Sequence, residues 1–435
     1  MTHFIQRYAG LFHVRGHENL LPFSGYLHGL LQLSHHRNMD MIGRLIPDVT
    51  NGQQIQHFIS TSHWENQRIR DQIIATANGF LGGHHDRALI IDETSKRAKG
   101  HATVGVTRQY LGCLGKVDSG QVWVTSVLYH AGLSMPIMMD LFLPECWATD
   151  RARCLKAEMP KESILYHSNI DLALTQVRYA IDQQVDFRWV LADAGYGKSF
   201  AFRKALDELG KWYVCDMDSD SKIYLTEPIP VPTKRTKANR DKPQTYQVTN
   251  VKPIKANAWA NAQVTDAWET HHMRKTAHGP LTAKILRRTV WIWHEGTQEV
   301  QQVELLIRKD DCRTGGLRVS LSNAGSVSPH RLAQMQSNRY WVERSFQDTT
   351  GELGLKDYRG RSWTGWQHHM TLVMLASLFI LESQYSDTQV GTYLRIGDIV
   401  SIFEHLFPRK TVTEEQVVAE LTRNMMKRKL IHSSA

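Results

Sequence analysis

Two apolar runs that each end in an aspartate constrain the fold of this chain more than any other feature. Residues 187–192 lead into Asp193, a glycine-containing turn and a helical pattern, and residues 87–91 lead into Asp92. A buried strand that ends in an acid and then reverses into a helix indicates an α/β sheet. If the two strands are neighbours, both carboxylates lie at one edge of that sheet. Paired carboxylates favour a site for a hard divalent cation.

The order of elements around these aspartates predicts a particular sheet. A turn-rich hairpin over residues 108–116 and two strands, 121–129 and 135–143, follow the strand of Asp92. An amphipathic helix over residues 170–184 then precedes the strand of Asp193. Three successive strands, a helix and a further acid-bearing strand favour an α/β fold of the ribonuclease-H-like kind.

Changes in hydrophobic periodicity divide the 435 residues into five segments. Both ends show helical spacing, whereas proline-rich and β-type stretches interrupt the predicted α/β core. The predicted organisation is a helical N-terminal domain (1–85), the first part of the core (86–225), a β-rich basic insertion (226–326), the second part of the core (327–385) and a helical C-terminal region that is a candidate for dimerisation (386–435).

The formal charge of +9 and the pI near 9.2 favour a polyanionic partner, nucleic acid before anionic membrane. A basic enzyme with a solvated surface fits the charge equally well. Residues 234–242 concentrate five positive charges and one negative charge in the insertion. The N-terminus has no signal-peptide hydrophobic stretch, and the longest apolar run (370–381) is too short to span a bilayer. A cytoplasmic protein without membrane contact is therefore predicted.

The helix predicted from residue 328 to about residue 350 carries a candidate third acid. It starts at a serine followed by a proline, a good N-cap and a good first helical residue. Spacings of four, four and three place one set of side chains on a single face of the helix: Arg339, Glu343, Gln347 and Thr350. Taken alone, the spacing of Arg339 and Glu343 favours the interpretation that they form an exposed salt bridge, which would stabilise the helix by roughly a few tenths of a kcal/mol.

Several motifs, in this order, resemble those of the DDE transposases of bacterial insertion sequences. Within these, the chain is similar to the groups with a β-rich insertion before the glutamate, insertion-sequence families four and seven hundred and one. The resemblance covers about residues 30–385. Its motifs include Ile91-Asp92-Glu93-Thr94, Arg108-Gln109-Tyr110, Leu143-Pro144-Glu145-Cys146-Trp147, Ala192-Asp193-Ala194-Gly195-Tyr196-Gly197, Trp341-Val342-Glu343-Arg344-Ser345-Phe346, Glu352-Leu353-Gly354-Leu355 and Arg361-Ser362-Trp363.

This resemblance implies metal-dependent phosphoryl transfer on DNA, in which element ends are cut and joined to a target. In such enzymes three carboxylates hold two Mg²⁺ (or Mn²⁺) ions, and they correspond here to Asp92, Asp193 and Glu343. The implied partners are double-stranded DNA, as terminal inverted repeats and as target, and a second copy of the chain, since element ends come in pairs. Candidate DNA contacts are Arg108, Lys116, Lys234, Arg235, Lys237, Arg240, Arg339, Arg359 and Arg361.

Two positions depart from the family's glutamate motif, because Gln336 replaces a tyrosine and Thr350 replaces a lysine. A catalytically decayed or domesticated DNA-binding protein on the same fold is therefore an alternative, as is a nuclease that cuts without joining. Residues 192–199 also fit a relaxed phosphate-binding loop, which leaves nucleotide hydrolysis as a further alternative. Residues 39–45 and 53–60 fit a helix-turn-helix, and the N-terminal domain is predicted to bind DNA. A plain helical packing domain fits the same pattern.

Overall fold

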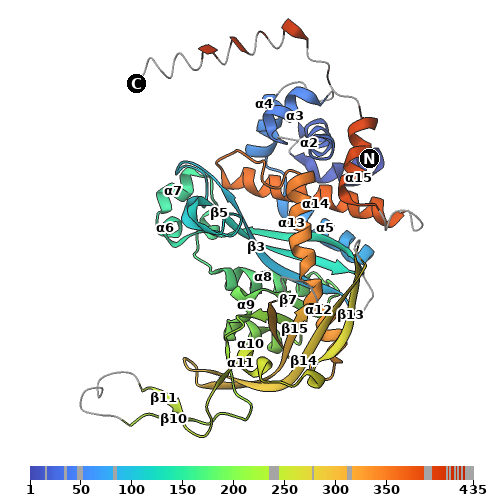
Figure 1. Ribbon diagram of the computed structural model, residues 1–435. Helices are drawn as coiled ribbons and strands as arrows, with labels where there is room; N and C mark the ends of the chain where they lie inside the picture. Colours follow the sequence, from blue (N-terminus) through green and yellow to red (C-terminus); the bar gives the residue numbers. More distant parts are fainter. Residues whose placement is uncertain are drawn as a thin grey trace.

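The computed structural model places helices from both ends of the chain together, beside a twisted central sheet. In Figure 1 these helices lie at the top, the sheet crosses the middle, and the strands of the predicted insertion form the lower part. The residues that the structure describes are 1–14, 17–33, 37–46, 52–81, 86–234, 244–276, 279–310, 316–386, 394–407, 410, 413–415, 418, 421–422 and 425–426.

The core of the sheet has the arrangement of a ribonuclease-H-like fold, which confirms the predicted fold class. Its strand order is β6-β5-β3-β7-β8, with β4 also beside β5. β3 pairs antiparallel with β5 and parallel with β7, and β7 pairs parallel with β8. The bounds are β3 (Ala88–Arg97), β4 (Thr107–Leu111), β5 (Lys116–His130), β6 (Leu133–Leu141), β7 (Trp189–Ala192) and β8 (Trp212–Met217).

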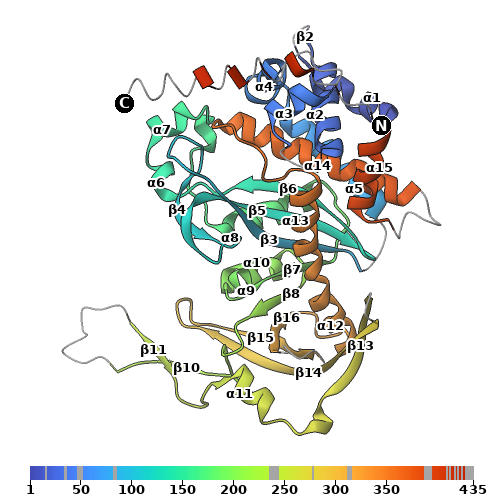
Figure 2. The ribbon, with the colours of Figure 1, turned by 45° about the horizontal axis from the view of Figure 1, so that its top comes forward.

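The strands of the insertion continue this sheet. β16 pairs antiparallel with β8, and β15, β14 and β13 follow outward, so that ten strands of the described chain form one sheet. A small hairpin of β10 (Pro230–Pro232) and β11 (Tyr246–Val248) extends away from the body (Figure 2). The predicted boundaries of the five segments of the chain stay a prediction. The insertion strands are β13 (Glu269–Thr276), β14 (Gly279–His294), β15 (Glu299–Asp310) and β16 (Leu317–Ser322).

Side-chain alternation along the strands gives the sheet two apolar faces. One face of β3, β7 and β8 packs with α8, α10 and the long α14. The other face packs with α12 and α13, through residues such as Leu332, Met335 and Val342. The helices have the bounds α8 (Asn169–Asp182), α10 (Phe200–Glu208), α12 (Pro329–Asn338), α13 (Tyr340–Glu352) and α14 (Trp363–Ser386).

Local capping explains where several of these helices begin. Ser168 and Asp171 form a capping box at the start of α8. The Ser199 hydroxyl accepts a hydrogen bond from the Phe202 amide at the start of α10. As predicted, Ser328 is the N-cap of α12, and its hydroxyl accepts a hydrogen bond from the Arg331 amide.

The N-terminal helices pack against the apolar helix α14, as do residues near the other end of the chain. α2 (Leu20–Gln32), α4 (Gly52–Ser60) and α5 (Asn66–Leu81) contact α14, and α15 (Ile396–Leu406) contacts α2. Adjacent His368 and His369 on α14 are buried, and burial lowers the pKa of each to about 4, so both are neutral core residues. Both segments of the predicted helix-turn-helix are helical, as α3 (Met39–Leu45) and α4, and residues 47–51 between them lie outside the described residues. Their assignment as a DNA-binding motif stays a prediction.

Among the described residues, no helix combines the length and the apolar character needed to cross a membrane.

Candidate active site

Asp92 and Asp193 stand side by side because their strands are parallel neighbours. The pairing of β3 with β7 sets Ile91 opposite Ala192, so the next residue on each chain is one of the two aspartates. By alternation, both side chains leave the sheet on the face that α12 and α13 cover. The two strand-end acids that the sequence singles out therefore share one site.

Asp193 is the N-cap of the short helix α9 (Ala194–Gly197). Its Oδ1 accepts hydrogen bonds from the backbone amides of Gly195 (2.9 Å) and Tyr196 (3.4 Å). These are the amides that a phosphate-binding loop would offer to a nucleotide, and here a carboxylate already engages them. This contact argues against the predicted alternative of nucleotide hydrolysis.

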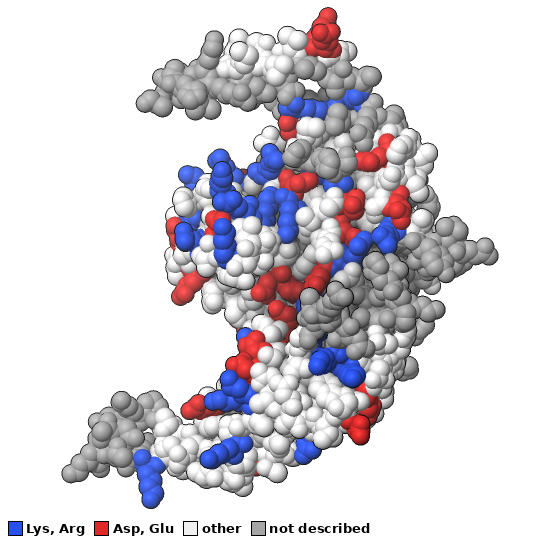
Figure 3. All heavy atoms as spheres, in the orientation of Figure 1, with Lys and Arg blue, Asp and Glu red and all other residues white. Residues whose placement is uncertain are grey.

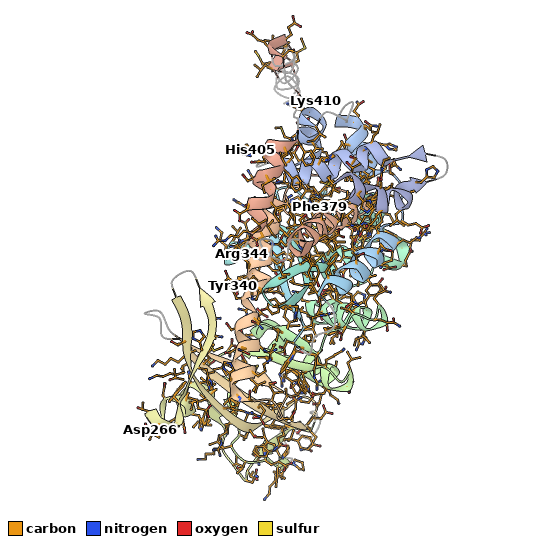
Figure 4. All side chains as sticks on the ribbon, turned by 90° about the vertical axis from the view of Figure 1, so that its right-hand side faces the viewer. Asp266, Tyr340, Arg344, Phe379, His405 and Lys410 are labelled. Atoms are coloured by element: carbon orange, nitrogen blue, oxygen red, sulfur yellow. The ribbon has the colours of Figure 1, made fainter. Side chains whose placement is uncertain are left out.

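Glu343 reaches the site from α13, with Arg339 one turn before it. The sequence predicts one continuous helix here, whereas the structure has two helices that meet at Arg339. Arg339 itself keeps right-handed helical backbone angles. The turn that follows it is tighter than an α-helical turn, because the Val342 amide donates a hydrogen bond to the Arg339 carbonyl three residues earlier (3.1 Å). Figure 4 shows this junction from the side, with Tyr340 and Arg344 marking the first turns of α13.

The Arg339 guanidinium lies among the carboxylates and contacts three of them. Nη2 is 2.9 Å from Glu343 Oε1, Nη1 is 3.5 Å from Asp92 Oδ2, and Nε is 2.9 Å from Asp216 Oδ2. The Arg339 and Asp92 side chains are only 15% and 16% exposed, whereas Glu343 is 48% exposed. The pairs with Asp92 and Asp216 are therefore shielded from solvent, unlike ordinary surface salt bridges, which contribute little.

The basic groups around the site do not fully compensate its negative charge. Burial, and then the neighbouring Asp193 carboxylate, raise the pKa of Asp92 to about 8, although Arg339 opposes them. Burial also raises the pKa of Glu93, whose carboxylate accepts a hydrogen bond from the Tyr196 hydroxyl (2.8 Å). Buried carboxylates of this kind favour an added cation.

The donor atoms fit a hard divalent cation, because the candidate ligands offer only carboxylate oxygen. Within the part of the chain that the structure describes, no three histidine, cysteine, aspartate or glutamate side chains are already gathered as a metal site. The residues thus fit Mg²⁺ or Mn²⁺ in chemistry and in their place on the fold.

Sequence reasoning missed Asp216. The parallel pairing of β7 with β8 sets Ala192 opposite Cys215, so Asp216 stands level with Asp193 on the next strand. The signal was present, because residues 212–215 form an apolar run that ends in an aspartate, the same form that identified the other two acids. Its Oδ1 accepts a hydrogen bond from the hydroxyl of Ser320 in β16 (2.6 Å).

The predicted DNA contacts fall in separate places. Arg108 on β4 and Lys116 on β5 are exposed on one hairpin. Arg359 and Arg361 are exposed in the loop before α14, where the Arg361 carbonyl accepts from the Val104 amide (3.0 Å) just before β4. Lys234 is exposed beside β10, whereas Arg235, Lys237 and Arg240 lie outside the described residues.

Basic and acidic side chains also separate on the surface. In Figure 3, acidic side chains gather in the hollow between the upper and lower parts of the molecule, and basic side chains cover the lobe above it. That lobe holds α6 (Glu145–Ala148), α7 (Arg151–Lys156) and the β4–β5 hairpin. A polyanion bound to the lobe would therefore border the acids.

The two departures from the glutamate motif have different surroundings. Gln336 is buried, and its Nε2 donates a hydrogen bond to Ser320 Oγ (2.7 Å). Thr350 is half-buried on α13. Gln336 thus belongs to the packing beneath the site, and it is not placed to contact DNA.

Comparison with known proteins identifies the family. The family model described as a DDE superfamily endonuclease matches residues 17–280, more than half of the chain, and the chain belongs to this family. It is also 30% identical over 202 residues to a probable transposase for insertion sequence element IS701 from Microchaete diplosiphon. That alignment covers 46% of this chain and 50% of the relative, about half of its length. The resemblance inferred from the motifs is thereby confirmed.

The matched region has a consequence for the site. It includes Asp92, Asp193 and Asp216, and it ends before Glu343. The assignment of Glu343 therefore depends on its motif and on its place beside Arg339, not on the family match.

Proposed function

We propose that this protein is a DNA transposase of an insertion sequence, which cuts the element ends and joins them to target DNA. The observation that supports this most directly is that Asp92 and Asp193 stand in register at the ends of two parallel strands, while Arg339 bridges Asp92 to Glu343 on the helix that packs over them. Membership of the DDE endonuclease family and similarity to a probable transposase favour the same activity. The proposed metal-holding residues are Asp92, Asp193 and Glu343.

The chain's own residues suit such a reaction. When bound, two divalent ions activate the attacking water or 3′-hydroxyl and stabilise the leaving oxygen. Asp92, Asp193 and Glu343 would hold these ions through their carboxylate oxygens. Because two amides hold Oδ1 of Asp193, its second oxygen is left for a ligand role. Arg339 would offset part of the negative charge of Asp92 and Glu343.

The basic lobe provides a place for the DNA. Arg108, Lys116, Arg359 and Arg361 are exposed, which suits contacts with backbone phosphates, and such contacts position a duplex without reading its sequence. Arg339 lies within the acid cluster, so we assign it to the catalytic centre and not to a free DNA-binding surface. The insertion, with Lys234 and its neighbours, would hold a second stretch of DNA, and two copies of the chain would bridge paired ends.

The test is cleavage and strand transfer on DNA that carries the element's own ends, with Mg²⁺ or Mn²⁺. Wild-type protein should cleave and join, and Asp193→Asn should do neither while still binding the DNA. Asp218→Asn is the matched control, because Asp218 is half-exposed and pairs only with Lys198 in the contacts described (2.9 Å). It should leave both steps intact.

Other results would select an alternative. Binding of the ends without metal-dependent cleavage would indicate a decayed or domesticated DNA-binding protein, and Thr350→Lys would then be the first reversion to examine. Cleavage without joined products would indicate a nuclease. Cleavage that survives in Asp193→Asn would refute the proposed set of acids.

A further inference from the structure

Asp216 is a third strand-end aspartate on the same face of the sheet as Asp92 and Asp193. β3, β7 and β8 are parallel, and their registers place the three acids at one level. The residues two positions earlier, Ile90, Leu191 and Val214, all belong to the apolar cluster under α12 and α13. By alternation, the three carboxylates therefore point toward the same helices.

A buried chain of hydrogen bonds fixes the Asp216 carboxylate on one side. Ser320 Oγ donates to Asp216 Oδ1 (2.6 Å), and Gln336 Nε2 donates to Ser320 Oγ (2.7 Å). Ser320 is fully buried and Gln336 is 4% exposed. Strands β8 and β16 and helix α12 thus hold this carboxylate in one orientation, because a buried polar group that lost its partner would be costly.

On its other side, Asp216 holds the guanidinium that contacts Glu343. Arg339 Nε donates to Asp216 Oδ2, and Arg339 Nη2 donates to Glu343 Oε1, both at 2.9 Å. A planar guanidinium that binds two carboxylates through different edges fixes their relative positions. Glu343 needs such a restraint, because its side chain is half-exposed and a free glutamate loses considerable rotamer entropy when it is ordered.

We propose that Asp216 is a positioning residue that anchors Arg339 and, through Arg339, sets Glu343 against Asp92 and Asp193. This role rests on the proposed metal-dependent function, and it adds a residue outside the three acids. Asp216 also draws Arg339 toward β8. Without that anchor, the guanidinium would pair more fully with Asp92 and Glu343 and would compete with the divalent ions.

The test measures Mn²⁺ affinity by electron paramagnetic resonance on the full chain without DNA. Asp216→Asn keeps the shape of the side chain and removes its charge, and it should weaken Mn²⁺ binding by about tenfold, as is typical when a residue that orients metal ligands is changed. Asp218→Asn removes the same charge two residues further along the chain, at an exposed carboxylate that pairs with Lys198, and it should leave the affinity within about twofold, since exposed charges are screened by solvent.

A double-mutant cycle separates positioning from a direct effect of charge. In an Arg339→Gln background, Asp216→Asn should have almost no further effect, because its action passes through Arg339. An equal loss in both backgrounds would mean that Asp216 acts on the ion itself, and no loss in either would mean that the anchor is not needed. Both results would overturn the proposal.

Two further measurements test the proposal if Asp216→Asn does not fold, and separate it from the transposase proposal. Ser320→Ala removes one hydrogen bond from Asp216 without changing any charge, and it should weaken Mn²⁺ binding in the same direction even if Asp216→Asn does not fold. Mn²⁺ binding that depends on Asp193 and shows the expected coupling, in a protein that does not cleave DNA, would refute the transposase proposal alone. A wild-type chain that does not bind Mn²⁺ would refute both proposals.

Discussion

The Asp92→Asn variant should be more stable than the wild-type protein when divalent cations are absent, and the difference should grow with pH. Burial and the Asp193 carboxylate raise the pKa of Asp92 from 3.8 to about 8. At about 1.4 kcal/mol for each pKa unit, this rise opposes folding by ~6 kcal/mol once Asp92 is fully ionised. Because proteins relax around a buried charge, we expect a measured difference of about 2–3 kcal/mol.

The direction of the pH dependence follows from the raised pKa. The folded protein binds the Asp92 proton more tightly than the unfolded chain does, so this proton stabilises the fold. That contribution is complete below about pH 4 and is lost as the pH rises to about 8. Asparagine is neutral throughout, so the variant avoids the loss. Other titrating groups are present in both proteins and largely cancel from the difference.

The measurement is thermal unfolding in EDTA, followed by circular dichroism at about pH 4.5 and about pH 8.5. The variant should exceed the wild type clearly at the higher pH and only slightly at the lower one. Asp218→Asn, at a half-exposed position, should show no such divergence. A variant that is equal to or less stable than the wild type at the higher pH would refute the reasoning, because Asp92 would then be compensated without a cation.

Three other changes follow from the same structure. Millimolar Mn²⁺ should raise the unfolding temperature of the wild type and not that of Asp193→Asn. A ligand at ten times its dissociation constant stabilises the folded protein by about 1.4 kcal/mol. Equal shifts in the two proteins would mean that the cation binds elsewhere. Gly197→Ala should cost about 2–3 kcal/mol in urea unfolding, because its Cβ would lie 2.0 Å from a backbone carbonyl of β8, whereas Gly10→Ala, with open space around it, should be nearly neutral. Arg70→Leu should cost about 3 kcal/mol, because it removes the guanidinium that lies 3.1 Å from the partly buried Asp140 carboxylate and leaves that carboxylate, among the contacts described, only the hydrogen bond from Gln176. Arg68→Leu, in the same helix, breaks an exposed pair with Glu65 and should cost less than about 0.5 kcal/mol; similar losses would contradict the burial argument.

The strand-end aspartates could be predicted because the relevant information is local. A short apolar run, an acid and a glycine-containing turn specify a buried strand that ends at a sheet edge, and the structure places Asp92 and Asp193 on paired strands. Helical spacing likewise linked Arg339 to Glu343, and the two side chains are in contact. The interpretation of this pair as an exposed salt bridge holds for Glu343, which is 48% exposed, and not for Arg339, which is 15% exposed. Burial of Arg339 depends on tertiary packing that periodicity does not contain.

The rest depended on contacts between distant parts of the chain. The same local rule applied to residues 212–216 would have identified Asp216, yet its importance arises only when β16 and α12 surround it. The pairing of β16 with β8 joins residues about a hundred positions apart, and propensity does not report such pairing. For this reason the sequence indicated a β-rich insertion without indicating that its strands would extend the core sheet.

The joining of β16 to β8 limits how this region can change during evolution. Ser320 in β16 supplies a hydrogen bond to Asp216, so replacing residues 226–326 as a cassette would remove part of the support beneath the acids. A graft from another protein would have to reproduce both the register and the hydroxyl. The β10–β11 hairpin does not support the acids in this way, because it extends from the body and its two strands pair with each other. Insertions and deletions should therefore be tolerated at that hairpin and rejected in β15 and β16, which a scan of short insertions through the region would reveal.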